Sequence, residues 1–502
     1  MQTLINTSIA LRKNLPAIWT EGRKLAVGFK HGDYFRVETN PNKKQIKFIR
    51  DPKGDFFVSK RTGKDGTILP LIEYKDEMLL SIFEVGMKIR IVVKDGVALI
   101  SVNGNCENTV NRVSRFLGKI QRGEPLEFGS LFTGGGVLDR AIHEGFKAAG
   151  IDSYLKIAVE SNEQYVEALL RNQSDLFKED SILVNSLIED LDIGKSFSLE
   201  VLIAGIPCTG SSPAGKSKLK IKNAEQHPQS GDCFFHTLNV IKATAPAVII
   251  LENVNAFENE MSFVVMQSVL THWGYKITKT SLNGCGFGSL ENRDRLGVVA
   301  VSDGLDDFSF DEFVFPLKKK EDSLNDFIVE LSEDDEQWRS YDYLSAKEVR
   351  DELAGKGFRR SLYDGSEPSV VTIRRLYHKG GSCDPFLKHP KFDDNNLTRK
   401  FLPIEHASFK GIPHFIIDGL SATLSHEILG QSVCFPVFYS VGYGVGLYAL
   451  KSAGIIDSFD VVCSDVVSGV LDAEDTDNVV QIDTFETVRV YRKSSSQLLS
   501  AA

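Results

Sequence analysis

Residues 126–136 read LEFGSLFTGGG, a short apolar run that passes directly into three glycines. The run predicts a buried strand, and the residues after it, VLDRAIHEGFKAAG (137–150), have apolar side chains at helical spacing. Such a turn lets the backbone approach a ligand closely, and the helix start offers free amides. The same turn also fits a plain strand–helix corner, so its role depends on what surrounds it.

Strands and helices alternate after this first unit. YLKIAVE (154–160), VLIAGIP (201–207) and AVIILENV (247–254) read as strands, and a helix-like stretch follows each. Two further strands, at 275–283 and 296–302, follow one another without a helix and predict an antiparallel edge. Repeated strand–helix units with apolar strands predict a doubly wound α/β domain, a parallel sheet covered on both faces.

The flanking segments have a different character. Residues 1–122 predict a small β-rich N-terminal domain, in which KDG (94–96) is typical of a hairpin turn. Its basic clusters, Lys43–Lys44 and Lys60–Arg61, fit either a DNA-contacting face or an ordinary solvated surface. The α/β pattern occupies 126–302, an acidic linker and a basic stretch fill 303–396, periodicity returns over 397–450, and 451–502 is an acidic tail.

Composition bounds the class of protein. With 502 residues, 42% hydrophobic and 25% charged, the chain has an ordinary globular composition, which excludes disorder throughout. The net charge of −10 hides a segment of about +5 between Lys356 and Lys400 and one of about −5 from Lys451 onward. What matters for a polyanionic partner is therefore the local face.

Cysteines and the chain's start indicate a cytoplasmic protein without metal. The seven cysteines (106, 208, 233, 285, 383, 434 and 463) include no CxxC pair, which argues against a disulfide framework and a zinc site. Arg12 and Lys13 interrupt any signal peptide. The uncharged run 433–450 is interrupted by Pro436 and three glycines, so we expect no membrane helix there.

Residue types with chemical potential stand at the predicted strand ends. Glu160, 24 residues past Gly136, is placed to hold the hydroxyls of a ribose, in a dinucleotide or in S-adenosylmethionine. Cys208 follows Pro207 at the end of one strand, and Glu252 ends the next. A lone cysteine is often only a buried structural residue. A thiol beside a carboxylate, however, suggests covalent catalysis with an acid partner.

Six motifs in order resemble the DNA (cytosine-5) methyltransferase family. SLFTGGG (130–136) is similar to the family's F-x-G-x-G-G, PCTGSSPAG (207–215) to P-C-Q-G-F-S-x-A-G, and LENV (251–254) to E-N-V. ENRDR (291–295) resembles Q-N-R-x-R, and RKFLPIEHASFKGIP (399–413) resembles R-x-L-T-x-x-E-x-A-R-L-Q-G-F-P. LGQSVCFPVF (429–438) resembles the late G-N-x-V motif. The likeness covers about 126–302 and 397–447.

The resemblance implies a Rossmann-like, S-adenosylmethionine-dependent methyltransferase domain with an inserted target-recognition region at 303–396. It implies that Cys208 attacks carbon 6 of a flipped-out cytosine, that Glu252 assists at the ring N3, and that Arg295, supported by Arg293, holds the exocyclic oxygen. It assigns the cofactor to a set of residues: Phe132, Thr133, Gly134, Gly135, Gly136, Glu160, Pro207, Gln431, Ser432 and Val433.

Two departures from the family pattern change specific contacts. Gln431 replaces an asparagine and keeps its amide, so contacts near the cofactor shift without vanishing. Glu291 replaces a glutamine, and we expect it to pair with Arg293 or Arg295. Neither departure removes Cys208 or Glu252, so the resemblance implies an active enzyme.

The DNA contacts and partners follow from the same resemblance. We expect phosphate contacts from the loop lysines and base reading from the basic stretch; these residues are Lys216, Lys218, Lys220, Lys222, Arg374 and Arg375. The expected partner is double-stranded DNA, with a restriction endonuclease as a candidate companion and a monomeric protein. Three alternatives stay open: methylation of transfer RNA, a non-catalytic DNA-binding regulator on this fold, and a nicotinamide-dependent oxidoreductase.

Overall fold

A computed structural model describes most of the chain and divides it into two compact units, Met1–Asn111 and Arg112–Ala502. Residues 1–456 are described apart from 195–196, 209, 212–215, 217–218, 357–358 and 392–395. Beyond residue 456, only the strands β24 (Ser458–Cys463), β25 (Val479–Val480) and β26 (Val488–Lys493) are described, as backbone. The greater part of the expected acidic tail, 451–502, therefore lies outside the described residues.

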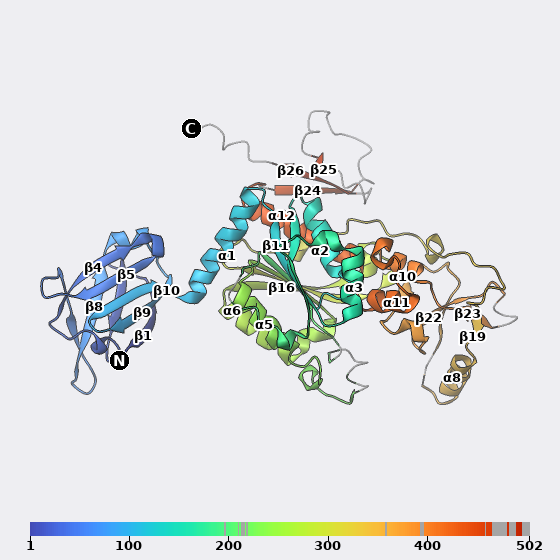
Figure 1. Ribbon diagram of the computed structural model, residues 1–502, viewed down its shortest axis with the longest axis horizontal. Coiled ribbons are helices and arrows are strands. Elements are labelled where there is room, and N and C mark those ends of the chain that lie inside the picture. The colour runs from blue at the N-terminus through green and yellow to red at the C-terminus, as the bar shows by residue number, and fades with distance from the viewer. Residues whose placement is uncertain are drawn as a thin grey trace. The chain divides into compact units, whose positions relative to one another are not determined.

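The larger unit is built on a seven-stranded sheet, of which Figure 1 labels β11 and β16. Its strand order is β13-β12-β11-β14-β15-β18-β16. The strands are β11 (Leu126–Leu131), β12 (Ser153–Glu160), β13 (Ile182–Asn185), β14 (Val201–Gly205), β15 (Val248–Asn253), β16 (Tyr275–Asn283) and β18 (Asp294–Ser302). All neighbours pair in parallel except β18, which is antiparallel to both β15 and β16. The expected antiparallel pair is present; of its two strands, β18 lies inside the sheet and β16 is an edge strand, and β13 forms the opposite edge.

Helices cover both faces of this sheet because its strands carry apolar side chains on both sides. Val201 and Ile203 of β14 face one core, and Leu202 and Ala204 face the other. The first core receives side chains from α1 (Gly104–Gln121), α2 (Val137–Ala148), α3 (Glu163–Asn172) and α12 (Phe435–Ser452). The second is closed by α5 (Cys233–Thr244) and α6 (Met261–His272). The doubly wound α/β prediction is confirmed.

Helix α12 corrects our interpretation of the uncharged run 433–450. Its glycines do not interrupt the helix, which runs unbroken from Phe435 to Ser452 and is buried over Phe435–Leu450. A Cβ on Gly442 would lie 2.5 Å from the carbonyl oxygen of Ile142 in α2, so the glycines permit close helix packing. Among the described helices, no single one is long and apolar enough to cross a membrane. Together with α11 (Ala422–Gln431), α12 forms a bent pair that passes this test only by length and composition.

Smaller elements, all but β17 within residues 303–421, complete this unit. A four-stranded sheet has the order β19-β23-β22-β20, and a short parallel pair joins β17 to β21. Their bounds are β17 (Glu291–Asn292), β19 (Arg339–Ser340), β20 (Ser361–Tyr363), β21 (Val370–Val371), β22 (Pro385–Lys388) and β23 (Leu397–Arg399). The helices are α7 (Phe310–Phe313), α8 (Asp342–Leu353) and α10 (Pro403–Phe409).

The smaller unit is a two-sheet β structure with its own core. One sheet has the order β1-β9-β10-β5-β4-β6, and the other β2-β3-β8-β7. The strands are β1 (Thr3–Ser8), β2 (Ala10–Arg12), β3 (Leu15–Glu21), β4 (Tyr34–Asn40), β5 (Gln45–Arg50), β6 (Phe56–Phe57), β7 (Ser59–Thr62), β8 (Ile68–Lys75), β9 (Lys88–Lys94) and β10 (Val97–Val102). Asp95 and Gly96 both have positive φ between β9 and β10, as the KDG turn predicts.

Candidate active site

The glycine turn lies at the point where the strand order of the sheet reverses. β11 has β12 on one side and β14 on the other, and ligands of open α/β sheets bind at this position. Gly134 and Gly136 have positive φ, and so does Phe132, a conformation that is costly for a residue with a side chain. A Cβ on Gly135 would lie 2.5 Å from Ile428. The positive φ angles and the close contact with Ile428 thus restrict the backbone conformation of the turn.

Glu160 ends β12 and holds this turn. Its two carboxylate oxygens accept the backbone N–H groups of Gly134 and Asn162, each at 2.8 Å. Each oxygen has a further lone pair, so the carboxylate fits two hydroxyl donors of a ribose as well. Gln431 also lies close to the turn, with its amide nitrogen 3.3 Å from the Cβ position of Gly134. These residues fit a nucleoside cofactor such as S-adenosylmethionine.

Three of the residues expected at the cofactor also make contacts within the protein. The Thr133 hydroxyl lies 2.8 Å from that of Ser130 and donates to the Val159 carbonyl, so it braces the turn. Val433 is 2% exposed and belongs to the hydrophobic core. The Ser432 hydroxyl donates to the Leu429 carbonyl at 2.7 Å, at the end of α11.

The ends of β14 and β15 bring the predicted catalytic groups together. Gly205 pairs in register with Glu252, so Cys208 follows a strand end directly beside that carboxylate. Arg295, on β18 next to β15, places its Nε 2.8 Å from the Glu252 Oε1. Glu252 and Arg295 thus form an ion pair beside the carboxyl end of β14, the strand that precedes Cys208.

Electrostatics couple Cys208 to the same groups. Burial raises the pKa of the Cys208 thiol, and the Glu252 carboxylate raises it further. Arg295 and Arg293 oppose this shift, because their positive charges favour the thiolate. Burial lowers the pKa of Arg295, Arg293 lowers it further, and Glu252 and Cys208 act in the opposite direction. The resting sulfur is therefore a protonated thiol beside two cations that stabilise its ionised form.

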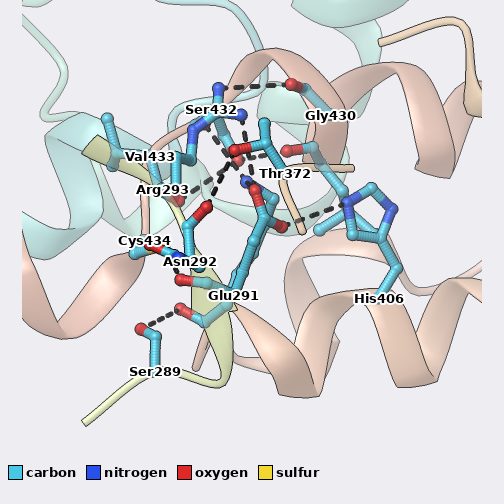
Figure 2. Close-up of polar contacts among 12 residues, drawn as sticks. Ser289, Glu291, Asn292, Arg293, Thr372, His406, Gly430, Ser432, Val433 and Cys434 are labelled. Atoms are coloured by element: carbon cyan, nitrogen blue, oxygen red, sulfur yellow. Dashed lines mark hydrogen bonds and ion pairs between the residues drawn. The ribbon is translucent and has the colours of Figure 1, made fainter. Parts of the chain in front are cut away.

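Arg293 lies in a buried network of polar contacts (Figure 2). Its guanidinium is 3.4 Å from Glu291 and donates to the Gly430 carbonyl at 3.3 Å. Glu291 is fully buried and also meets the Lys410 ammonium at 3.1 Å. The expected pairing of Glu291 with one of the two arginines is thus present, to Arg293, while Arg295 pairs with Glu252.

Lys410 is a residue that the sequence analysis missed. It stands where the family segment R-x-L-T-x-x-E-x-A-R-L-Q-G-F-P has its glutamine, just as Glu291 stands at the glutamine of Q-N-R-x-R. Two positions that carry neutral glutamine side chains in the family motifs therefore carry a buried ion pair here. Burial and Arg293 lower the pKa of Lys410 to about 8, although Glu291 raises it. Both motifs depart from glutamine, one to Glu291 and the other to Lys410, and this was the feature of the sequence that could have predicted the ion pair.

His406 completes this network. Its Nε2 lies 3.9 Å from the Glu291 carboxylate, and Figure 2 shows the two side chains directed toward one another. Complete burial and the cations around it, Lys410 first, hold the pKa of His406 well below its ordinary value. The imidazole is therefore neutral, and Lys410 and Arg293 carry the positive charge that balances Glu291.

The residues expected to contact DNA lie in different environments. Lys216 pairs with Glu260, Lys220 and Lys222 are exposed, and Lys218 lies outside the described residues. Arg374 is bound to the buried Asp384 at 2.7 Å, and Arg375 lies 4.0 Å from Glu427 and over the Tyr165 ring. Their contacts with DNA stay predictions. The ion pair shows that Arg374 also braces its own loop.

Comparison with known proteins agrees with this geometry. The family described as C-5 cytosine-specific DNA methylase matches residues 126–446. The type II methyltransferase M.Bsp6I of Bacillus sp. (strain RFL6) is 28% identical over 333 residues, which span 64% of this chain and 98% of that protein. The type II methyltransferase M.NlaX of Neisseria lactamica is 28% identical over 258 residues, 51% of this chain and 78% of that protein.

A solved structure supports the fold independently. The Dnmt2 methyltransferase of S. pombe superposes with a TM-score of 0.51 at 20% identity, covering 65% of this chain and 98% of that one. The match to the family extends over more than half of the chain and includes the glycine turn, both strand ends and the turn after α11. This chain belongs to the C-5 cytosine-specific DNA methylase family, enzymes that transfer a methyl group from S-adenosylmethionine to carbon 5 of cytosine in DNA.

Proposed function

We propose that this chain performs cytosine-5 methylation of duplex DNA with Cys208 as the nucleophile. The observation that carries the proposal is the meeting of Cys208 and Glu252, at the carboxyl ends of β14 and β15, with Arg295, at the amino end of the antiparallel β18. The chemistry needs a thiolate because carbon 5 of cytosine is a poor nucleophile until a sulfur adds to carbon 6. The pairing of Glu252 with Arg295 supports roles for both beside that sulfur.

Each group has a distinct task in this proposal. The Cys208 thiol gives up its proton to solvent, and the thiolate sulfur forms a bond to carbon 6 as the double bond between carbons 5 and 6 opens. Glu252 assists by hydrogen bonding or protonation at the ring N3. Arg295 holds the exocyclic oxygen and stabilises the charge that develops there, while Arg293 positions it from the buried network. Loss of the carbon 5 proton and elimination from carbon 6 then free Cys208.

The cofactor residues are proposed on the contacts around the glycine turn. Glu160 holds the ribose hydroxyls, the amides of Gly134, Gly135 and Gly136 border the site, and Gln431 closes it from α11. S-adenosylmethionine, when bound, supplies the methyl group that carbon 5 receives. Phe132 and Pro207 border this site in the proposal, and Thr133 and Ser432 shape it through the hydrogen bonds described above.

Several finer assignments are part of the same proposal. The target base is flipped out of the duplex, since no enzyme group reaches carbon 6 inside the stack. Residues 303–396 select the sequence, and Lys216, Lys218, Lys220 and Lys222 contact phosphates. Of the two arginines expected to read bases, Arg375 is the stronger candidate, because Asp384 already engages Arg374. We further propose a monomer in the cytoplasm that acts with a cognate restriction endonuclease, as relatives are named type II methyltransferases.

Tritium-labelled S-adenosylmethionine offers a direct test with two substrates, genomic duplex DNA and bulk transfer RNA. We expect label in the duplex, identified as 5-methylcytosine by mass spectrometry. Cys208→Ser should lose methyl transfer yet bind the cofactor normally in calorimetry, while Cys106→Ser, in the N-terminal unit, should keep full activity. Label in transfer RNA alone would contradict DNA as substrate, and a Cys208→Ser enzyme with a tenth of normal turnover would contradict the nucleophile.

A further inference from the structure

The two compact units carry charges of opposite sign. Residues 1–111 contain eighteen Lys and Arg against twelve Asp and Glu, a net charge of +6. The remaining residues therefore carry −16, since the whole chain has −10. A unit this basic on an otherwise acidic protein points to a polyanionic partner for that unit in particular.

The positive charge gathers on one face of the six-stranded sheet. Ile46, Phe48, Ile89 and Ile91 point into the core, so the residues alternating with them point outward. Directly paired residues share a face, which aligns Arg90 with Ser101, Lys47 with Leu99 and Arg36 with Ile49. Glu38, paired with Lys47 across β4 and β5, is an exposed carboxylate on the same face. We define the basic sheet face as the exposed cations of β4, β5 and β9: Arg36, Lys47, Lys88, Arg90 and Lys94.

Most of these cations lack a neutralising partner within their own unit. Among the described residues of 1–111, no carboxylate lies within 4 Å of the side-chain nitrogens of Lys47, Lys88 or Arg90. On the other sheet, Lys75 pairs with Glu73 at 2.8 Å and Arg61 pairs with Glu21, while among the described residues of this unit no carboxylate lies within 4 Å of the Lys60 nitrogen. On the basic sheet face itself, Arg36 pairs with Glu38 and lies 3.5 Å from Asp51, and Lys94 lies 3.9 Å from Asp95. The cations of this face without a carboxylate partner in the described part of the unit are therefore Lys47, Lys88 and Arg90.

The spacing of the cations indicates what they bind. Lys47 on β5 and Arg90 on β9 are separated by β10, so their strands lie about 10 Å apart. Arg36 lies one strand further. No small anion reaches all of them, whereas a chain of phosphates does.

We propose that the basic sheet face is a second DNA-binding surface, which holds backbone phosphates of duplex DNA and reads no bases. The inference goes beyond the methylation site and rests on the proposed function only for the choice of DNA as the polymer. Contacts of this kind add affinity that is independent of sequence and falls steeply with salt.

The test is a salt titration of the full chain with and without these cations. Binding to a fluorescein-labelled duplex of about 40 base pairs is measured by anisotropy between about 50 and 300 mM KCl without cofactor. The triple variant Lys47→Ala, Arg90→Ala, Lys94→Ala should make the slope of log affinity against log salt shallower by up to about 2.7, or about 0.9 per lost contact. A control triple, Lys13→Ala, Lys60→Ala, Lys64→Ala, removes the same charge from exposed positions outside this face and should keep the wild-type slope.

The outcomes separate this proposal from the catalytic one. Equal slopes for the wild type and the face triple would overturn the second surface, whatever the activity of Cys208. Equal loss in both triples would also overturn it, because only net charge would then matter. If the face triple weakened binding of a single-stranded RNA of about 40 nucleotides but not of the duplex, the face would bind RNA, and the proposal of duplex DNA would be wrong. Single variants Lys47→Ala and Lys94→Ala, each expected to lower the slope by about 0.9, keep the test valid if the triple does not fold.

Discussion

Glu252 has two opposing effects on Cys208, and they can be measured separately. Its negative charge raises the pKa of the thiol, which slows reaction of the sulfur with a simple electrophile. In the proposed mechanism the same carboxylate activates the cytosine ring, which accelerates attack by the sulfur. The two effects act on different partners of the same bond-forming step.

Glu252→Gln should therefore change two rates in opposite directions. Alkylation of Cys208 by iodoacetamide should become faster at neutral pH, because the pKa of the thiol falls and more thiolate is present. Methyl transfer should fall by about 10²-fold or more, since the ring N3 loses its acid. Stopped-time alkylation followed by peptide mass spectrometry gives the first rate. Slower alkylation in this variant would contradict the charge coupling between the two residues.

The Glu291–Lys410 pair predicts strong non-additivity. Glu291→Gln alone leaves Lys410 and Arg293 buried without their counter-charge and should cost about 3 kcal/mol of unfolding free energy or more. Glu291→Gln with Lys410→Gln restores two neutral amides and should recover most of that loss. Urea unfolding of both single variants and the double variant completes the cycle. Additive losses in the double variant would mean that the two residues do not stabilise one another.

Asp139 gives a pH-dependent prediction in the first turn of α2. Burial raises the pKa of its carboxyl to about 7 from 3.8, although a hydrogen bond with Ser130 opposes the shift. Between these values the folded protein keeps a proton that the unfolded chain releases, so rising pH through this range favours unfolding. The amide of Asp139→Asn cannot ionise, so the variant lacks this loss of stability. Its free energy of unfolding relative to wild type should rise between pH 4 and pH 7, by up to about 4 kcal/mol.

Urea unfolding at pH 5 and pH 8 measures the Asp139 effect, with Asp152→Asn, an exposed position, as the control. The difference between Asp139→Asn and wild type should be larger at pH 8 than at pH 5. A difference that stayed constant, or shrank as the pH rose, would show that the folded carboxyl is already ionised at pH 5.

At the scale of elements, the contact between α2 and α12 depends on glycine. A Cβ on Gly442 would lie 2.5 Å from the carbonyl oxygen and 2.8 Å from the Cα of Ile142. Gly442→Ala should therefore cost about 1–3 kcal/mol by overpacking, although alanine is the better helix former by about 1 kcal/mol. Gly286→Ala is the matched control, since no described heavy atom lies within 4 Å of that Cβ position. If Gly442→Ala were as stable as Gly286→Ala, the helices would not be in close contact there.

The strands of the sheet were predictable because burial on both faces leaves near-continuous apolar runs, as in VLIAGIP and AVIILENV. β13 was missed because its four residues, Ile182–Asn185, are only partly buried and carry no long apolar run. α12 was misread because glycines that permit helix packing look the same in a sequence as glycines that break a helix. Which of the two holds depends on a partner helix far away in the chain.

The site was predictable to the extent that its residues end strands. Cys208, Glu252 and Glu160 could be placed because parallel strands deliver their carboxyl ends to one edge. Lys410 and the ion pair between Arg374 and Asp384 could not, because they depend on contacts formed only after the chain folds. Motif departures become informative when two of them meet, as Glu291 and Lys410 do.

For the whole molecule, the central claim is that the enzyme forms a covalent bond between the Cys208 sulfur and cytosine in DNA. Duplex DNA in which 5-fluorocytosine replaces cytosine traps this bond, because fluorine at carbon 5 cannot leave as a proton does and the sulfur is not eliminated. After incubation with S-adenosylmethionine, digestion and mass spectrometry should find the adduct on the peptide that contains Cys208. The adduct should be absent without cofactor and absent in Cys208→Ser. An adduct on another cysteine, or methylation of normal DNA with no adduct on the fluorinated duplex, would contradict the account.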